Sequence, residues 1–291
     1  KVVLVVWRMC APMSCLECLP NEVLASLSDF LGTPVLSCVC RRLWQVLQRR
    51  HVRYRVGADD LHVVTDTCLA SPSLRSAFIT VLPDSSSDDS ANMFSRLFRW
   101  RRPAVAQSLG CLRIAPTLQT LSLTLRSQDV RDAGAHAIGS LKALPVLRTF
   151  YLNLSDNNVG ASGAEALADL RSAPSLTCLC LNLARNKLAN AGAQALAALK
   201  EAPGLRTLIL DLQHNDVSNS GAKALATLKE APSLQTLCLD LGTNNVGYMG
   251  VEALVSMREH NPSIHQLELY LCGNHVGPVG AHLLRSKGFH N

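Results

Sequence analysis

Aromatic residues are scarce in this sequence: they make up 4% of the 291 residues, whereas apolar residues of all kinds make up 48%. Leucine and alanine must therefore fill most of the core. Long apolar runs are missing as well. The chain opens with VVLVVW at 2–7, a run of six apolar residues, and a helix that crosses a bilayer needs about 20. We therefore expect no membrane span.

Common catalytic motifs are missing too. The sequence contains no P-loop, no GxGxxG motif after a predicted strand and no HExxH motif. Its histidines have no serine or cysteine partner at a fixed spacing. We therefore expect no catalytic residues, no cofactor and no metal site, and we interpret the chain as a protein that is not an enzyme.

The sequence does contain a unit of 29 or 30 residues that occurs six times over 118–291. For example, AGAQALAALKEAP at 191–203 returns as SGAKALATLKEAP at 220–232. Each unit begins with LxxLxLxL, which alternates apolar and polar residues as a half-buried strand does. An amide follows, and then a segment with helical spacing that ends at a proline.

Several columns hold through all six units. One is the amide column, whose side chains can hydrogen-bond neighbouring units. Since each unit covers its apolar face only when units stack, this period predicts a solenoid. The amide column comprises Gln128, Asn157, Asn186, Asn215, Asn244 and Asn274, and a glycine column comprises Gly134, Gly163, Gly192, Gly221, Gly250 and Gly280.

This pattern resembles the leucine-rich repeat family, in particular its ribonuclease-inhibitor-like class. The resemblance implies an α/β fold: a leucine-rich-repeat solenoid shaped as a horseshoe, with parallel strands on the concave face and helices on the convex face. A degenerate first repeat is expected over 57–117, with an inserted loop at 83–103. Its strand pattern, PSLRSAFITV at 72–81, places Leu74, Ala77, Ile79 and Val81 in the apolar columns.

Residues 1–56 are expected to form a small helical module. Its segment 16–47 carries two apolar runs with helical spacing, separated by Gly32 and Pro34. This segment resembles an F-box, which opens with LPxE and ends with a V-[SC]-[RK]-x-x-W-like pattern. The alternative is a helical cap over the exposed core of the first repeat. The F-box resemblance implies that the adaptor subunit of an SCF-type cullin ubiquitin ligase binds Leu19, Pro20, Leu24, Leu31, Leu36 and Trp44.

The residues between the leucines of each strand should face outward, two, four and six positions after the first leucine. A curved parallel sheet presents such rows as an extended binding surface. Tyrosine is a favoured anchor in binding surfaces, and acidic side chains favour a basic partner. We expect this concave face to bind a target protein through Tyr151, Asn153, Asn182, Ile209, Asp211, Asp240, Glu268 and Tyr270.

Asp211 and Asp240 share a column in adjacent repeats, so their carboxylates should lie about 5 Å apart. Such a pair could perform acid–base chemistry or bind a cation. On an open strand surface, a solvated acidic patch is the favoured interpretation.

Positive charge gathers in the N-terminal third. Residues 1–117 hold 14 Lys and Arg against 9 Asp and Glu, whereas 118–291 hold 14 against 13. The nearly neutral repeats argue against a nucleic-acid partner. A nucleic-acid hypothesis would rest on the basic segments at 41–55 and 96–102.

The chain has 11 cysteines. Cys180 and Cys238 share a column two repeats apart, a separation of roughly 10 Å that no disulfide can bridge. Free thiols indicate a reducing compartment, the cytoplasm or the nucleus.

The leading hypothesis from the sequence is a non-catalytic substrate receptor of an SCF-type ubiquitin ligase, which presents the repeats to a target protein. The alternative is a scaffold subunit of a larger assembly, in which the N-terminal helices act as a solenoid cap. The oligomeric state is left open.

Overall fold

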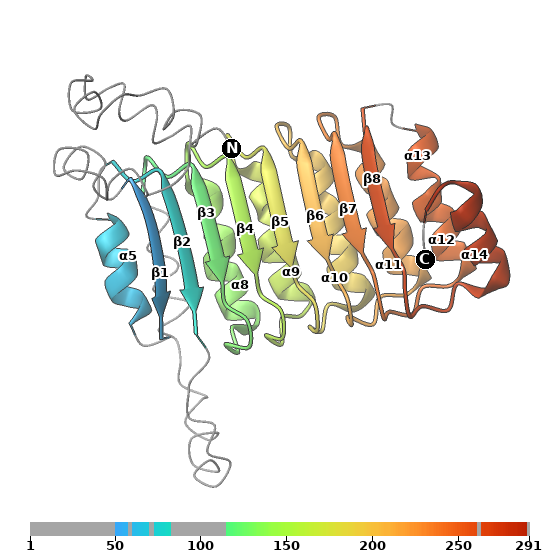
Figure 1. Ribbon diagram of the computed structural model, residues 1–291, viewed down its shortest axis with the longest axis horizontal. Helices are drawn as coiled ribbons and strands as arrows, with labels where there is room; N and C mark the ends of the chain where they lie inside the picture. The colour runs from blue at the N-terminus through green and yellow to red at the C-terminus, as the bar shows by residue number, and fades with distance from the viewer. Residues whose placement is uncertain (1–49, 58–59, 70–72, 83–114, 261–262, 290–291) are drawn as a thin grey trace, which may run out of the picture.

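The computed structural model describes residues 50–57, 60–69, 73–82, 115–260 and 263–289 (Figure 1). The F-box-like segment 16–47, with its adaptor-binding candidates, and the insert 83–103 lie outside these residues and stay predictions. Within the described part of the chain, no helix combines the length and the apolar character that a membrane span requires.

Eight parallel strands form one open sheet, and their order in the sheet is their order in the chain. Corresponding residues of neighbouring repeats pair directly, as Leu121 does with Phe150 and Leu208 with Leu237. The period of the sequence therefore becomes the register of the sheet. The strands are β1 (His51–Val56), β2 (Ser76–Val81), β3 (Thr120–Thr124), β4 (Thr149–Asn153), β5 (Cys178–Asn182), β6 (Thr207–Asp211), β7 (Thr236–Asp240) and β8 (Gln266–Tyr270).

Helices connect the strands of the repeats and lie together behind the sheet in Figure 1. Between β3 and β7, each α-helix runs into a short 3-10 helix that ends before the proline. This alternation confirms the predicted α/β solenoid. The α-helices are α5 (Leu61–Leu69), α8 (Arg131–Gly139), α9 (Ala161–Ala168), α10 (Ala189–Leu196), α11 (Asn219–Leu225), α12 (Tyr248–Val255), α13 (Met257–His260) and α14 (Gly277–Ser286), and the 3-10 helices are η4 (Ser140–Ala143), η5 (Asp169–Ser172), η6 (Ala197–Glu201) and η7 (Ala226–Glu230).

The core lies between the sheet and the helices. Because successive side chains of a strand point to opposite faces, Leu179 and Leu181 of β5 are buried while their neighbours are not. Leucines and alanines of the helices, such as Ala193 and Leu196 of α10, cover them. Each buried leucine contributes about 1.5–3 kcal/mol, so the repeats are held together chiefly by this shared core.

Upstream of the repeats, the sheet holds one expected and one unexpected strand. β2 lies where the degenerate repeat was expected, and its four apolar-column residues are buried. β1 was not predicted: the helical module was expected to reach residue 56, but residues 51–56 pair with β2 along their full length. HVRYRV alternates apolar and charged residues as a strand does. This segment lacks the leucines of the repeat, and His51 lies only 25 residues before its partner Ser76, which is shorter than the repeat period. The repeat pattern therefore did not predict this strand.

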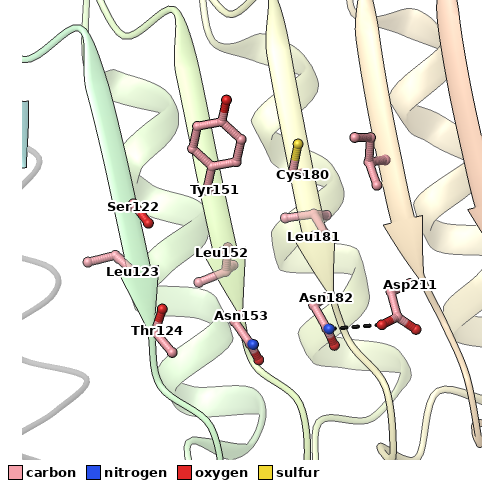
Figure 2. A pocket seen from close by; sticks show the side chains of 11 residues that line it. Ser122, Leu123, Thr124, Tyr151, Leu152, Asn153, Cys180, Leu181, Asn182 and Asp211 are labelled. Atoms are coloured by element: carbon pink, nitrogen blue, oxygen red, sulfur yellow. Dashed lines mark hydrogen bonds between the residues drawn. The ribbon is translucent and has the colours of Figure 1, made fainter. Parts of the chain in front are cut away.

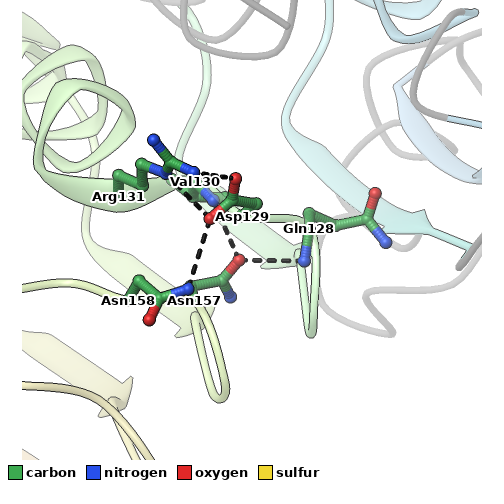
Figure 3. A network of polar contacts seen from close by, with 6 residues as sticks. All are labelled: Gln128, Asp129, Val130, Arg131, Asn157 and Asn158. Atoms are coloured by element: carbon green, nitrogen blue, oxygen red, sulfur yellow. Dashed lines mark hydrogen bonds and ion pairs between the residues drawn. The ribbon is translucent and has the colours of Figure 1, made fainter. Parts of the chain in front are cut away.

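A column of buried side-chain amides joins the repeats beyond the strand ends. The Oδ1 atom of Asn157 accepts hydrogen bonds from the N–H groups of Gln128 and Val130, at 2.9 and 3.1 Å (Figure 3). Its Nδ2 group donates to the carbonyl of Leu125 at 2.8 Å. All three partners belong to the preceding repeat, so the predicted role of the amides is confirmed. The same kinds of bond are made by Asn186, Asn215, Asn244 and Asn274.

A second column of side chains caps helices in the following repeat. The Oδ1 atom of Asp132 accepts hydrogen bonds from the N–H groups of Gly160 and Gly163 at the start of α9, at 2.7 and 3.1 Å. Asn190 does the same at the start of α11, and Asn219 at the start of α12. The residue before each of these helices is extended, with φ between −107° and −102°.

This capping explains part of the glycine column, at Gly163, Gly221 and Gly250. A Cβ atom on Gly221 would lie 2.8 Å from the Oδ1 atom of Asn190 and 2.7 Å from Cγ1 of Val217. Contacts this short do not occur, so glycine is required where the capping side chain approaches the helix.

The capping column is interrupted at Ala161, which has no side-chain acceptor. In the next repeat, α10 begins at Ala189, which has a left-handed φ of 50°. The N–H of Ala189 donates to the backbone carbonyl of Asn215 and not to a capping side chain. The left-handed region costs an L-residue about 1–2 kcal/mol. Loss of a cap in one repeat thus strains the turn in the next.

We expect Asn186→Ala to lower the free energy of unfolding by about 3 kcal/mol, because buried N–H and carbonyl groups of two repeats lose their partners at once. Chemical denaturation measures this change. Aspartate has the same shape as asparagine, but in Asn186→Asp a carboxylate would face the carbonyls of Leu154 and Leu183. We therefore expect Asn186→Asp to be nearly as unstable as Asn186→Ala. A loss below about 1 kcal/mol for the alanine variant would contradict the role given to the column.

We expect Ala161→Asn to raise the free energy of unfolding by about 1–2 kcal/mol, because it supplies the missing cap and lets residue 189 leave the left-handed region. Chemical denaturation again measures the change. Asn190→Ala is the matched converse and should lower stability by about 1 kcal/mol. Equal stability of Ala161→Asn and the wild type would overturn this account of the turn.

Candidate functional site

The candidate site is the face of the sheet that the described helices leave uncovered, here called the open face. It consists of the side chains two, four and six positions after the first leucine of each repeat, as the sequence predicts, together with the outward residues of β1 and β2. Large side chains stand out of it: Tyr151 is 42% exposed, Ile209 37% and Tyr270 48%. A sheet face without such residues would be smooth, so these three side chains give the open face its raised and hollow regions.

A groove of about 310 Å³ lies on the open face, across β3 to β6 (Figure 2). The tyrosine ring stands at one side and polar side chains follow at the ends of the strands. The groove can therefore receive an apolar group and a polar group together. Its outward-facing lining residues are Ser122, Thr124, Tyr151, Asn153, Cys180, Asn182, Ile209 and Asp211.

The row at the strand ends is fixed by the backbone. The Oδ1 atom of Asn182 accepts a hydrogen bond from the N–H of Ala184 at 3.1 Å, and that of Asp211 accepts one from Gln213 at 3.2 Å. Asn153 and Asp240 make the equivalent contact in their own repeats. The sequence analysis missed this role, although an Asn or Asp at a strand end is typical of such turns. These side chains therefore shape the turn and are held in place by it.

Asp211 and Asp240 pair across β6 and β7, so the predicted closeness of the two residues is confirmed. Their other oxygens accept from side-chain amides: Asn182 Nδ2 donates to Asp211 at 2.8 Å, and Gln213 Nε2 donates to Asp240 at 2.6 Å. Burial, with the nearby charge of Asp240, raises the pKa of Asp211 above its ordinary value, against the opposing hydrogen bond from Gln213. A cationic group beside Asp211 would therefore favour its ionised form, which burial disfavours.

The acidic character continues on β8. Glu268 accepts hydrogen bonds from Gln266 Nε2 at 2.7 Å and from the Tyr270 hydroxyl at 3.2 Å. These bonds hold the pKa of Glu268 below its usual range, and the contact with Glu268 raises the pKa of Tyr270. Glu268 is therefore a fixed anion at this end of the open face.

Two thiols, which the sequence analysis left out of the site, also lie on the open face. Cys178 and Cys180 are both half-buried on β5, and Cys180 pairs with Tyr151 of β4. Hydrogen bonds from Cys180 and Tyr151 lower the pKa of the Cys178 thiol to about 7, and the Cys178 contact, with burial, raises that of Cys180. The alternation CLCL placed both thiols on one face and was the signal that could have revealed them.

The structure brings some of the predicted site residues together and separates others. Five of them line the groove: Tyr151, Asn153, Asn182, Ile209 and Asp211. The other three, Asp240, Glu268 and Tyr270, lie on the next two strands, outside the groove. Among the described residues, no group of three or more His, Cys, Asp or Glu side chains is arranged to hold a metal ion.

We expect Asp211→Asn to become more stable relative to the wild type as the pH rises from about 3 to about 7. A raised pKa means that the folded state holds the proton more tightly than the unfolded chain. Ionised Asp211 therefore costs stability above its folded pKa and costs none below the ordinary value of 3.8. Thermal melting across this range measures the difference, and a difference that is constant with pH would refute the raised pKa.

A comparison with family models identifies the repeat in the sequence. A family model described as Leucine Rich repeat matches 151–168, 175–197 and 205–226, stretches that contain the end of β4 and the whole of β5 and β6. The comparison with curated proteins gave no match. Among solved structures, the chain is similar to the crystal structure of a Bacteroides fragilis protein, with 13% identity, a TM-score of 0.39 and coverage of 82% of this chain and 72% of that one. The chain thus contains leucine-rich repeats, and their strands build the open face of an α/β solenoid.

Proposed function

We propose that this chain is a non-catalytic protein-interaction module that holds a target protein on its open face. The observation that carries the proposal is the open face itself: a sheet face with a groove, exposed tyrosines and no described helix over it. Leucine-rich repeats generally bind proteins. Tyrosine anchors give a large contact area at a small cost in side-chain entropy, and Tyr151 and Tyr270 occupy such positions.

The charges of the open face select the orientation of the partner. Asp211, Asp240 and Glu268 make the β6–β8 end acidic. At the other end, Arg53 and Arg55 of β1 are exposed, and the Arg53 guanidinium lies 5.4 Å from the centre of the Phe78 ring. A partner with a basic patch facing β6–β8 and an acidic patch facing β1 would complement both ends.

The finer form of the proposal is a substrate receptor of an SCF-type ubiquitin ligase. It rests on the F-box resemblance of residues 16–47, which precede the sheet in the chain. In this arrangement the N-terminal segment docks on the ligase adaptor and the open face holds the substrate. The covalent chemistry then belongs to partner subunits.

A photo-crosslinking residue placed on the open face tests the first part. We expect a crosslinker at Tyr151 to capture a protein in cells that a crosslinker at Glu165, exposed on α9 of the same repeat, does not capture. The captured protein is then purified, and its affinity for the wild type is compared with that for Tyr151→Ala and for Asp211→Lys. The variants should weaken binding by about 1 kcal/mol or more, and identical capture at 151 and 165 would argue against the open face.

A pulldown with the purified adaptor subunit tests the second part separately. The receptor hypothesis expects binding by the wild-type chain and loss of binding in a Leu19→Ala/Pro20→Ala variant. Absence of binding at micromolar adaptor would refute the receptor hypothesis. The scaffold alternative, with the N-terminal helices as a cap, would then apply, and the crosslinking result would be unaffected.

A further inference from the structure

The groove on the open face has two raised sides and a low floor between them. In the middle row of side chains, four positions after the first leucine of each repeat, Tyr151 of β4 and Ile209 of β6 are large, and the smaller Cys180 of β5 pairs with both. The strands of Tyr151 and Ile209 are two spacings apart, about 10 Å. A methylene chain that touches both sides needs about 7–8 Å between them, two contacts of 3.5–4.0 Å. The space above Cys180 therefore fits one extended or flat group.

One end of this space is acidic. Asp211 lies two residues after Ile209 on β6, and it is the one carboxylate or cation among the residues that line the groove. Figure 2 shows the Asp211 carboxylate beside Asn182, whose Nδ2 group donates to it at 2.8 Å. On the next strand, Asp240 pairs with Asp211. A group that lies over Cys180 and extends toward the strand ends thus meets a carboxylate.

The carboxylates of the open face differ from those of the 3-10 helices in their partners. Asp169, Glu201 and Glu230 lie 2.7, 3.1 and 2.6 Å from a Lys or Arg nitrogen. Among the described residues, no Lys or Arg forms an ion pair with Asp211 or Asp240. Their donors are backbone N–H groups and side-chain amides, which are neutral. A cation from another molecule would supply what the described part of the chain does not.

The hydrogen bonds of Asp211 leave room for two more donors. A carboxylate has about four acceptor positions, two on each oxygen. Oδ1 of Asp211 accepts from the N–H of Gln213, and Oδ2 accepts from the amide of Asn182. One position on each oxygen therefore remains, and two parallel donors that reach both oxygens are the geometry of a guanidinium. A lysine ammonium is a point charge without such a fork.

We propose that the groove receives an arginine side chain of the target protein, with its stem between Tyr151 and Ile209 and its guanidinium on the carboxylate of Asp211. The inference rests on the proposed function, since the arginine belongs to the protein that the open face holds. The ring of Tyr151 gives the arginine an aromatic surface on which to stack. Asp240 adds negative charge one strand further on.

Titration of the full chain with short synthetic peptides tests the inference. The probe carries one arginine between glycine and serine residues, and two matched peptides carry citrulline or lysine in its place. Citrulline keeps the shape of arginine and removes its charge. Methyl NMR follows Ile209, one of five isoleucines in the chain, with the buried Ile138 of α8 as the reference. We expect the arginine peptide to shift the Ile209 signal in the millimolar range and to bind roughly fivefold more tightly than the citrulline peptide.

Two variants separate the carboxylate from the rest of the groove. Asp211→Asn keeps the shape and removes the charge, so the arginine and citrulline peptides should bind it equally. Glu165→Gln removes the same charge from the exposed surface of α9 and should keep the wild-type preference. Circular dichroism verifies that both variants fold.

Three results would overturn the inference. They are an Ile209 signal that no peptide shifts in the millimolar range, a citrulline or lysine peptide that binds as tightly as the arginine peptide, and an Asp211→Asn variant that retains the preference for arginine. Capture of a target by the crosslinker at Tyr151 together with any of these results would leave the proposed function standing and reject the arginine alone.

Discussion

Each repeat of this protein is positioned by a buried amide that bonds the repeat before it. Asn157 alone accepts from two backbone N–H groups of the preceding repeat and donates to one of its carbonyls. Buried backbone groups require partners, and beyond the strand ends the sheet no longer supplies them. The leucine core gives most of the stability, but it is not directional. The amides therefore fix the spacing between repeats, and the in-register sheet follows from that spacing.

A fixed spacing makes the open face a preorganised surface. The side chains at the strand ends, such as Asn182 and Asp211, accept from a backbone N–H two residues on, so the turn holds them before any partner arrives. Side chains that are already ordered lose less entropy on binding. The same order keeps Asp211 half-buried beside Asp240, although burial and, to a lesser extent, the charge of Asp240 raise the pKa of Asp211. Ionised Asp211 therefore costs free energy in the unbound protein, and a cationic partner beside it would lower that cost.

The period of the sequence predicted the strands of the six repeats, the buried columns and the amide bonds, because these depend only on what the repeats share. It did not predict β1, since HVRYRV has the alternation of a strand without the spacing of a repeat. The capping role of Asp132, Asn190 and Asn219 was also missed. These residues belong to one repeat and act in the next, so their partners become visible only when the units are stacked. The conformation of Ala189 depends likewise on Ala161, 28 residues earlier.

The positions that break the pattern carry what is specific to this chain. A leucine in a buried column fills the core, and it does so in the same way in every repeat. On the open face the strand-end row shapes the turns, but the middle row has no such shared task, and it holds Tyr151 beside Cys180 and Ile209 beside Cys238. The core gains nothing from these side chains, and exposed tyrosine and isoleucine add apolar surface that water disfavours. Smaller side chains such as Ser122 and Cys238 occupy the same row, so the fold does not require Tyr151 or Ile209. Contact with another molecule would offset the cost of exposing these two side chains.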